Sequence, residues 1–115
     1  MEMPSFPGHP SLVSLARFCE AGGLSPEGLR GALIAKRLFA VEMRGQLLLP
    51  SFFLDARYER RQLEVVCSVL GDLLGGSKLQ FFTNPRGSLN GRTPLDALVD
   101  GDFALVRRAA EGFAE

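Results

Sequence analysis

The stretch GSLNGRTPLDALVDGD (residues 87–102) contains the signals for two helix starts and one helix end. Thr93 can cap a helix with its hydroxyl, Pro94 suits the first helical position, and an aspartate three residues after the cap nearly completes a capping box. Gly101 suits the left-handed conformation that ends a helix, and Asp102 can cap the next helix. The stretch therefore predicts two short helices with a fixed crossing, preceded by a rigid turn.

The composition is that of one ordinary globular domain. The chain has 115 residues, of which 46% are hydrophobic and 23% are charged, and this length is enough to bury a core in a single domain. Its 13 basic residues balance 13 acidic ones, so overall charge neither drives nucleic-acid binding nor opposes self-association. Because nine phenylalanines are also more than a small core easily hides, we expect a homodimer.

No segment of the sequence suggests a membrane span or an export signal. No apolar run approaches the roughly 18 residues that a membrane span needs. The opening MEMPSFPGHP has neither the basic region nor the apolar core of a signal peptide. We therefore expect a cytoplasmic protein with no membrane partner.

Residues for metal or catalytic chemistry are sparse. His9 is the one histidine, and Cys19 and Cys67 lie too far apart for a zinc or redox motif. The stretch GDLLGGSK (residues 71–78) differs from a phosphate-binding loop, because its Gly-Ser-Lys order is wrong and a helix is expected before it. We predict a non-enzymatic protein that holds no metal and no cofactor.

Three prolines mark residues 1–10 as an irregular arm, and a helical pattern begins after it. Ser11 can cap a first helix, whose apolar residues recur at positions i, i+3, i+4 and i+7 until Gly22 and Gly23 end it. Ser25 then caps a second helix, which has proline at its first position. This order predicts a helix-turn-helix.

Two extended runs follow the second helix, at residues 38–43 and 46–49, and Gly45 in the turn between them predicts a hairpin that a proline then closes. The block of residues 11–50 resembles the small winged helix-turn-helix domains of excisionase and MerR-type proteins, in which the second helix enters the major groove of DNA. That resemblance implies DNA contacts by four basic residues, Arg30, Lys36, Arg37 and Arg44. The alternative is a helix-hairpin unit that only builds the core, with these cations solvated.

The middle of the chain predicts one confident helix between less regular segments. SFFLDARYERRQ (residues 51–62) is typical of a loop or short turn and carries two aromatic residues that we expect to be exposed. The next helix has an apolar stripe at helical spacing, formed by Leu63, Val66, Cys67 and Leu70. Gly71, Gly75 and Gly76 are expected to break this helix, and residues 78–82 fit either a short helix or a strand.

The C-terminal segment, KLQFFTNPRGSLNGRTPLDALVDGDFALVRRAAEGFAE, resembles the toxin-binding domain of Xre/MbcA/ParS-type antitoxins. The matching pieces are the run FFTNP (residues 81–85), the turn and helix start LNGRTPLD (residues 89–96), and the stop at Gly101 and Asp102. Asn90 stands where that family has glycine. Since both residue types tolerate positive φ, we expect the turn to be kept.

The resemblance implies a partner and a binding face. The usual partner of that family is a RES-domain toxin that destroys NAD, and this cofactor belongs to the partner. The implied partner-binding residues lie around the turn and on the last helix: Phe81, Phe82, Asn84, Pro85, Ser88, Leu89, Asn90, Gly91, Arg92, Arg107 and Arg108. We expect Arg92 to point outward, so that reversing its charge leaves the stability nearly unchanged.

These patterns together predict an α+β, mainly α fold in one domain. It comprises a small helix-turn-helix with a β-hairpin wing over residues 11–50, followed by a C-terminal helical unit over residues 57–115. Two functions stay open at this point. One is an antitoxin-like interaction module that binds and restrains a cognate toxin, and the other is a winged-helix DNA-binding transcriptional regulator.

Overall fold

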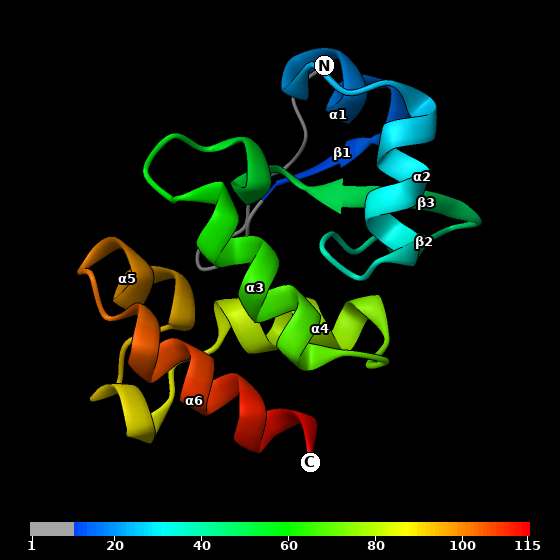
Figure 1. Ribbon diagram of the computed structural model, residues 1–115. Helices are drawn as coiled ribbons and strands as arrows, with labels where there is room; N and C mark the ends of the chain where they lie inside the picture. Colours follow the sequence, from blue (N-terminus) through cyan, green and yellow to red (C-terminus); the bar gives the residue numbers. More distant parts are fainter. Residues whose placement is uncertain (1–10) are drawn as a thin grey trace.

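The computed structural model describes residues 11–115 and confirms the α+β, mainly α fold class (Figure 1). The α-helices are α1 (Leu15–Gly22), α2 (Pro26–Ile34), α3 (Arg60–Leu70), α4 (Gly75–Thr83), α5 (Pro94–Val99) and α6 (Phe103–Ala114). The strands are β1 (Leu12–Ser14), β2 (Val41–Met43) and β3 (Gln46–Pro50), and two short 3-10 helices are η1 (Ser51–Leu54) and η2 (Gly87–Leu89). The predicted arm of residues 1–10, with His9, lies outside the described residues.

The three strands form one antiparallel sheet in the order β1-β3-β2. β1 corrects the prediction of a helix from Ser11, because residues 12–14 pair with residues 48–50 of β3. Ser14 then caps α1, and its hydroxyl accepts a hydrogen bond from the amide of Arg17 at 3.2 Å. Helical spacing of the apolar residues gave the wrong element here, because a segment far along the chain provides a strand partner.

The predicted hairpin is present in β2 and β3. Both central residues of its turn, Arg44 and Gly45, are left-handed, with φ of 52° and 77°, as a two-residue type I′ turn requires. β2 is shorter than expected, since Leu38 and Phe39 leave the sheet and are buried in the core.

Two predicted helix caps and one predicted helix end are confirmed. The hydroxyl of Ser25 accepts from the amide of Gly28 at 2.9 Å at the start of α2. That of Thr93 accepts from the amide of Asp96 at 3.0 Å at the start of α5. Gly101 has φ of 88°, the left-handed conformation expected after α5.

The helix predicted in the middle of the chain is α3, and its apolar stripe is fully buried as expected, at Leu63, Val66, Cys67 and Leu70. Gly71 follows its last residue, but Gly75 and Gly76 begin α4 instead of interrupting a helix. Residues 78–82 are therefore helical. Gly75 is where α4 meets the sheet: a Cβ there would lie 2.9 Å from the carbonyl carbon of Ala40 and closer still to its oxygen.

One hydrophobic core connects the N-terminal and C-terminal parts. Phe39 and Phe52 contact Phe82 of α4, with ring centroids 6.0 and 5.1 Å apart. Phe52 and Phe53, predicted to be exposed, are both buried, because η1 turns them inward. Every phenylalanine among residues 11–115 is buried in this core or packed against it, so the phenylalanine count no longer supports self-association.

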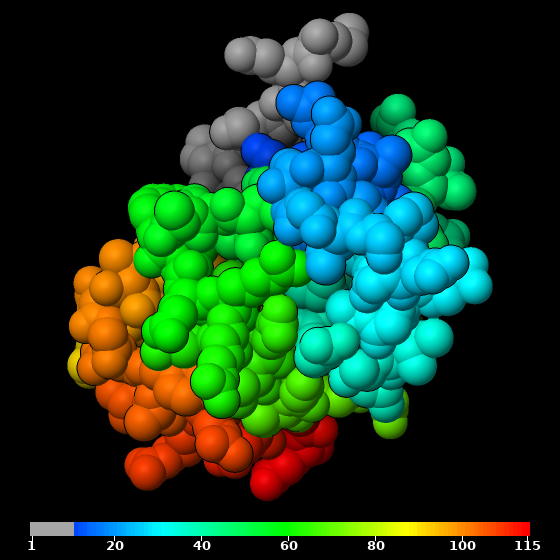
Figure 2. Space-filling model, turned by 45° about the horizontal axis from the view of Figure 1, so that its top comes forward, coloured from blue at the N-terminus to red at the C-terminus, as the bar shows by residue number. Residues whose placement is uncertain are grey.

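The helices divide the surface into two regions. α3 and α4 lie between the sheet and the pair α5 and α6 (Figure 1). In Figure 2 the cyan atoms of α2 lie on the right of the molecule, and the orange and red atoms of α5 and α6 lie along its left and lower edges. The two candidate binding surfaces are therefore well separated. Within residues 11–115 no helix is long and apolar enough to cross a membrane.

Candidate functional site

The connection from α4 to α5 is a loop whose two ends are hydrogen-bonded to each other. We call residues 84–92 the closed loop. The amide of Arg86 donates to the carbonyl of Arg92 at 3.1 Å, and the amide of Gly91 donates to the carbonyl of Arg86 at 2.9 Å. Asn90, with φ of 59°, adopts the left-handed conformation expected from its match to a family glycine. Leu89 is fully buried and attaches the loop to the core.

Arg92 closes the C-terminal end of this loop. Its Nη1 lies 2.7 Å from Oδ2 of Asp102 and 3.1 Å from Oδ2 of Asp100, and its Nε donates to the carbonyl of Leu89 at 2.9 Å. Pairing with Asp102 and Asp100 raises the pKa of the Arg92 guanidinium. The prediction that Arg92 points outward is wrong, because these carboxylates and the loop carbonyl engage its side chain.

The same contacts correct the role predicted for Asp102. Its side chain makes no capping hydrogen bond at the start of α6, and its carboxylate pairs with Arg92 instead. Both a carboxylate cap and the pair with Arg92 would be charge-assisted, but in the pair both groups carry a charge.

Arg86 closes the N-terminal end of the loop and was missed by sequence reasoning. Its guanidinium carbon lies 4.6 Å from the ring centroid of Phe81 and 4.5 Å from that of Phe113. Burial lowers the pKa of this guanidinium. No local pattern could reveal the arrangement, because Phe113 belongs to the last turn of α6, far along the chain.

The structure divides the predicted partner-binding residues into two groups, apart from the half-buried Arg92, whose side chain pairs with Asp100 and Asp102. Phe81, Phe82 and Leu89 are in the core, so they cannot touch a partner while the protein stays folded, and assigning them to the binding face was wrong. Burial of large apolar side chains explains this placement. The residues that are exposed are Asn84, Pro85, Ser88, Asn90 and Gly91 in the closed loop, and Arg107 and Arg108 on α6.

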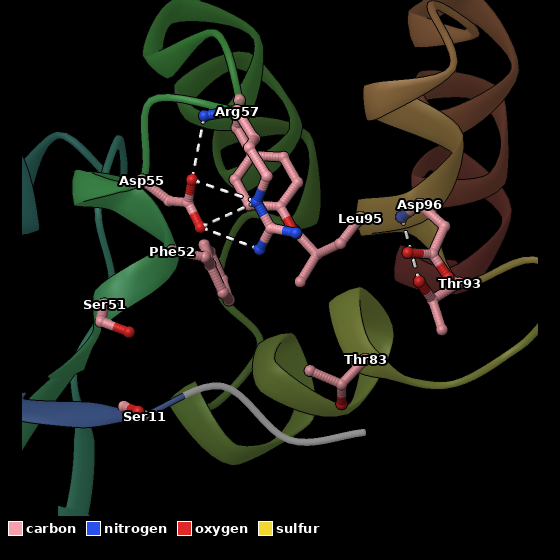
Figure 3. A pocket seen from close by; sticks show the side chains of 10 residues that line it. Ser11, Ser51, Phe52, Asp55, Arg57, Thr83, Thr93, Leu95 and Asp96 are labelled. Carbon is pink, nitrogen blue, oxygen red and sulfur yellow. Dashed lines mark hydrogen bonds and ion pairs between the residues drawn. The ribbon is translucent and has the colours of Figure 1, made fainter. Parts of the chain in front are cut away.

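A pocket of about 420 Å³ lies at the foot of the closed loop (Figure 3). Thr83 and Thr93, which flank the loop in the sequence, line one side, and Asp55, Arg57 and Tyr58 line the other. Arg57 holds Asp55 through two nitrogens, with Nη2 2.9 Å from Oδ2 and Nε 3.2 Å from Oδ1, and this lowers the pKa of the Asp55 carboxyl. The pocket is therefore a polar recess that a side chain of a partner bound to the loop could enter.

The basic residues predicted to contact DNA are not equally available. Arg30 on α2, Arg37 after it and Arg44 in the hairpin turn are exposed. Lys36 is only partly exposed, and its ammonium forms an ion pair with Asp72. Three of the four cations can therefore meet a phosphate backbone without first breaking an ion pair of the described structure.

The described residues show little sign of metal or thiol chemistry. No three His, Cys, Asp or Glu side chains between residues 11 and 115 are grouped so that they could hold a metal ion. Burial raises the pKa of the Cys67 thiol to about 11, which disfavours the reactive thiolate near neutral pH. Comparisons of the chain with protein-family models, with curated proteins and with solved structures found no match.

Proposed function

We propose that this protein is a non-enzymatic, antitoxin-like interaction module that binds and restrains a cognate toxin through the closed loop. One observation carries the proposal. The loop is held at both ends by arginine side chains, while six of its residues remain exposed: Asn84, Pro85, Gly87, Ser88, Asn90 and Gly91.

A loop that is already ordered binds at low entropic cost, because little chain freedom is lost when the partner arrives. The exposed positions are also suited to recognition. Asn and Ser provide adaptable hydrogen-bonding groups, and glycine lets a partner approach the backbone closely. The polar pocket at the foot of the loop extends this surface toward Asp55 and Tyr58.

The resemblance of the C-terminal segment names the class of partner to test, a RES-type toxin that destroys NAD. The proposal predicts a toxin-sized reading frame beside the gene of this protein. The experiment uses the product of that reading frame and measures its affinity for the full chain and its NAD consumption. The full chain should bind it and slow the loss of NAD. If the wild-type chain neither binds nor inhibits this product, the proposed function is wrong.

Two exposed serines provide a matched pair of variants. Ser88→Arg places a long side chain on the closed loop, and Ser68→Arg places the same side chain on the exposed face of α3. We expect Ser88→Arg to weaken the complex by about tenfold or more, as changes at the centre of an interface do, and Ser68→Arg to bind like wild type. Equal binding by both would place the binding face elsewhere.

A DNA-binding regulator is the second candidate function, favoured by the exposure of Arg30, Arg37 and Arg44 on α2, after it and at the hairpin turn. Fluorescence anisotropy with DNA from the promoter region tests it. Each of these arginines replaced by alanine should lower the slope of log affinity against log salt by about one. Lys36→Ala should lower it less, because Asp72 already pairs with this lysine. Absence of binding at low salt would refute this candidate.

A second copy of the chain is a further proposed partner. Ile34 and Leu74 are 73% and 80% exposed, the highest values among the large apolar residues of the described surface, and an interface would remove them from water. Sedimentation at micromolar concentration should show a dimer. A monomer alone would contradict this part of the proposal.

A further inference from the structure

We infer that Arg86 is the residue of the closed loop that recognises a carboxylate of the partner protein, from an aspartate or glutamate side chain. This inference rests on the proposed function and deepens it by naming the chemistry of the contact. The reasons are the stacking of Arg86, its unbalanced charge and its place in the loop.

The guanidinium of Arg86 packs against two adjacent aromatic rings. Phe81 from α4 and Phe113 from α6 lie 4.6 and 4.5 Å from its central carbon, and the two rings are themselves 5.3 Å apart between centroids. Such contacts stabilise the cation and restrict the torsions of a long side chain. Arg86 therefore meets a partner with little side-chain entropy left to lose.

The charge of Arg86 is not balanced within the described structure. Two other arginines, one beside the pocket and one in the loop, have acidic partners: Arg57 pairs with Asp55, and Arg92 pairs with Asp100 and Asp102. None of the ion pairs formed among residues 11–115 includes Arg86, and its Nε is covered without an acceptor. A partly desolvated cation without an anion is unfavourable, so an incoming anion gains more here than at a fully solvated arginine.

The geometry favours a carboxylate. The two rings lie beside the guanidinium, so an acceptor reaches it along its edge. The planar fork of arginine matches a planar carboxylate through two parallel hydrogen bonds. Arg86 lies between Pro85 and Gly87, which are both exposed, so a partner that touches the loop also reaches the partly exposed side chain of Arg86. Arginine is among the residues that dominate protein interfaces for this reason.

The first arm of the test needs no partner. Acetate is the probe, added to the ¹⁵N-labelled full chain at constant ionic strength with chloride as the reference, and the Nε–Hε signals of the arginines are followed by NMR. The signal of Arg86 should shift and saturate, while that of the exposed Arg61 should not. If acetate shifts the Arg86 signal no more than it shifts the Arg61 signal, the inference is overturned. A stronger response to inorganic phosphate than to acetate would overturn the choice of a carboxylate and would favour nucleic acid.

The second arm uses the toxin candidate from the neighbouring reading frame. Arg86→Lys keeps the charge without the planar fork, Arg86→Met keeps only an apolar stem, and Arg61→Met is the control on α3. Both Arg86 variants should bind about tenfold more weakly or worse, and Arg61→Met should bind like wild type. Thermal melts of each variant establish that it is folded at the temperature of the titration.

The outcomes separate the inference from the proposed function. If the wild-type chain binds the candidate and the Arg86 variants bind equally well, the inference is wrong and the proposed function stands. If the wild-type chain does not bind, the proposed function fails, and the acetate titration alone decides whether Arg86 recognises carboxylates.

Discussion

Replacing Gly75 with alanine should force α4 away from the sheet. The added Cβ would lie 2.9 Å from the carbonyl carbon of Ala40, closer to its oxygen, and 3.4 Å from Cα of Val41. All three atoms belong to the backbone, so no change of side-chain rotamer can relieve the overlap. Either α4 or the segment that leads into β2 must move.

The size of the effect follows from this contact. Overpacking of a well-packed core typically costs about 1–3 kcal/mol, and a clash with backbone on both sides belongs at the upper end of that range. Moving α4 also loosens the contact of Phe82 with Phe39 and Phe52. For a chain of this size, about 3 kcal/mol corresponds to a fall in the thermal midpoint of roughly 10 °C or more.

Gly76 provides the matched control one residue further along α4. A Cβ at this position meets nothing within 4 Å. Gly76→Ala should therefore raise the free energy of unfolding by about 0.5–1 kcal/mol, because alanine has the higher helix propensity. Thermal and urea unfolding of both variants measure the difference. If Gly75→Ala melts at or above the wild-type temperature while Gly76→Ala behaves as expected, the close approach of α4 to Ala40 is refuted.

Three further predictions concern the closed loop and the core. Leu89→Ala should lower the free energy of unfolding by about 2–5 kcal/mol, because the leucine side chain is fully buried. An unchanged midpoint of urea unfolding would contradict this. Arg92→Glu should lower the thermal midpoint more than Thr93→Ala does, since it places a third carboxylate beside Asp100 and Asp102. If Arg92→Glu leaves the thermal midpoint unchanged, these ion pairs do not hold the loop. The Cys67 thiol, whose pKa burial raises to about 11, should react with a thiol reagent at pH 8 only through unfolding. Stability should fall as pH rises from about 9 toward 11, because the unfolded thiol ionises first, and rapid native-state labelling of a Cys19→Ser variant would refute its burial.

Features that depend on neighbours a few residues away could be predicted from the sequence. The caps at Ser25 and Thr93 each need one hydroxyl and an amide three residues later. The turn at Arg44 and Gly45 needs two residues that accept positive φ, and the stripe of α3 needs only helical spacing. The fold class followed from these elements, because their order leaves few ways to bury the apolar faces.

The errors arose where distant residues decide the outcome. Residues 12–14 became a strand because β3 pairs with them, and Gly75 lies at the start of α4 where the backbone of Ala40 leaves no room for a side chain. The candidate site depends still more on such contacts. Arg86 and Arg92 belong to the same loop, but one meets Phe113 in the last turn of α6 and the other meets Asp102, the residue just before α6. A local sequence pattern determines which backbone conformation has the lowest free energy at each position. The partner of a long charged side chain depends instead on which groups the packed core brings within its reach.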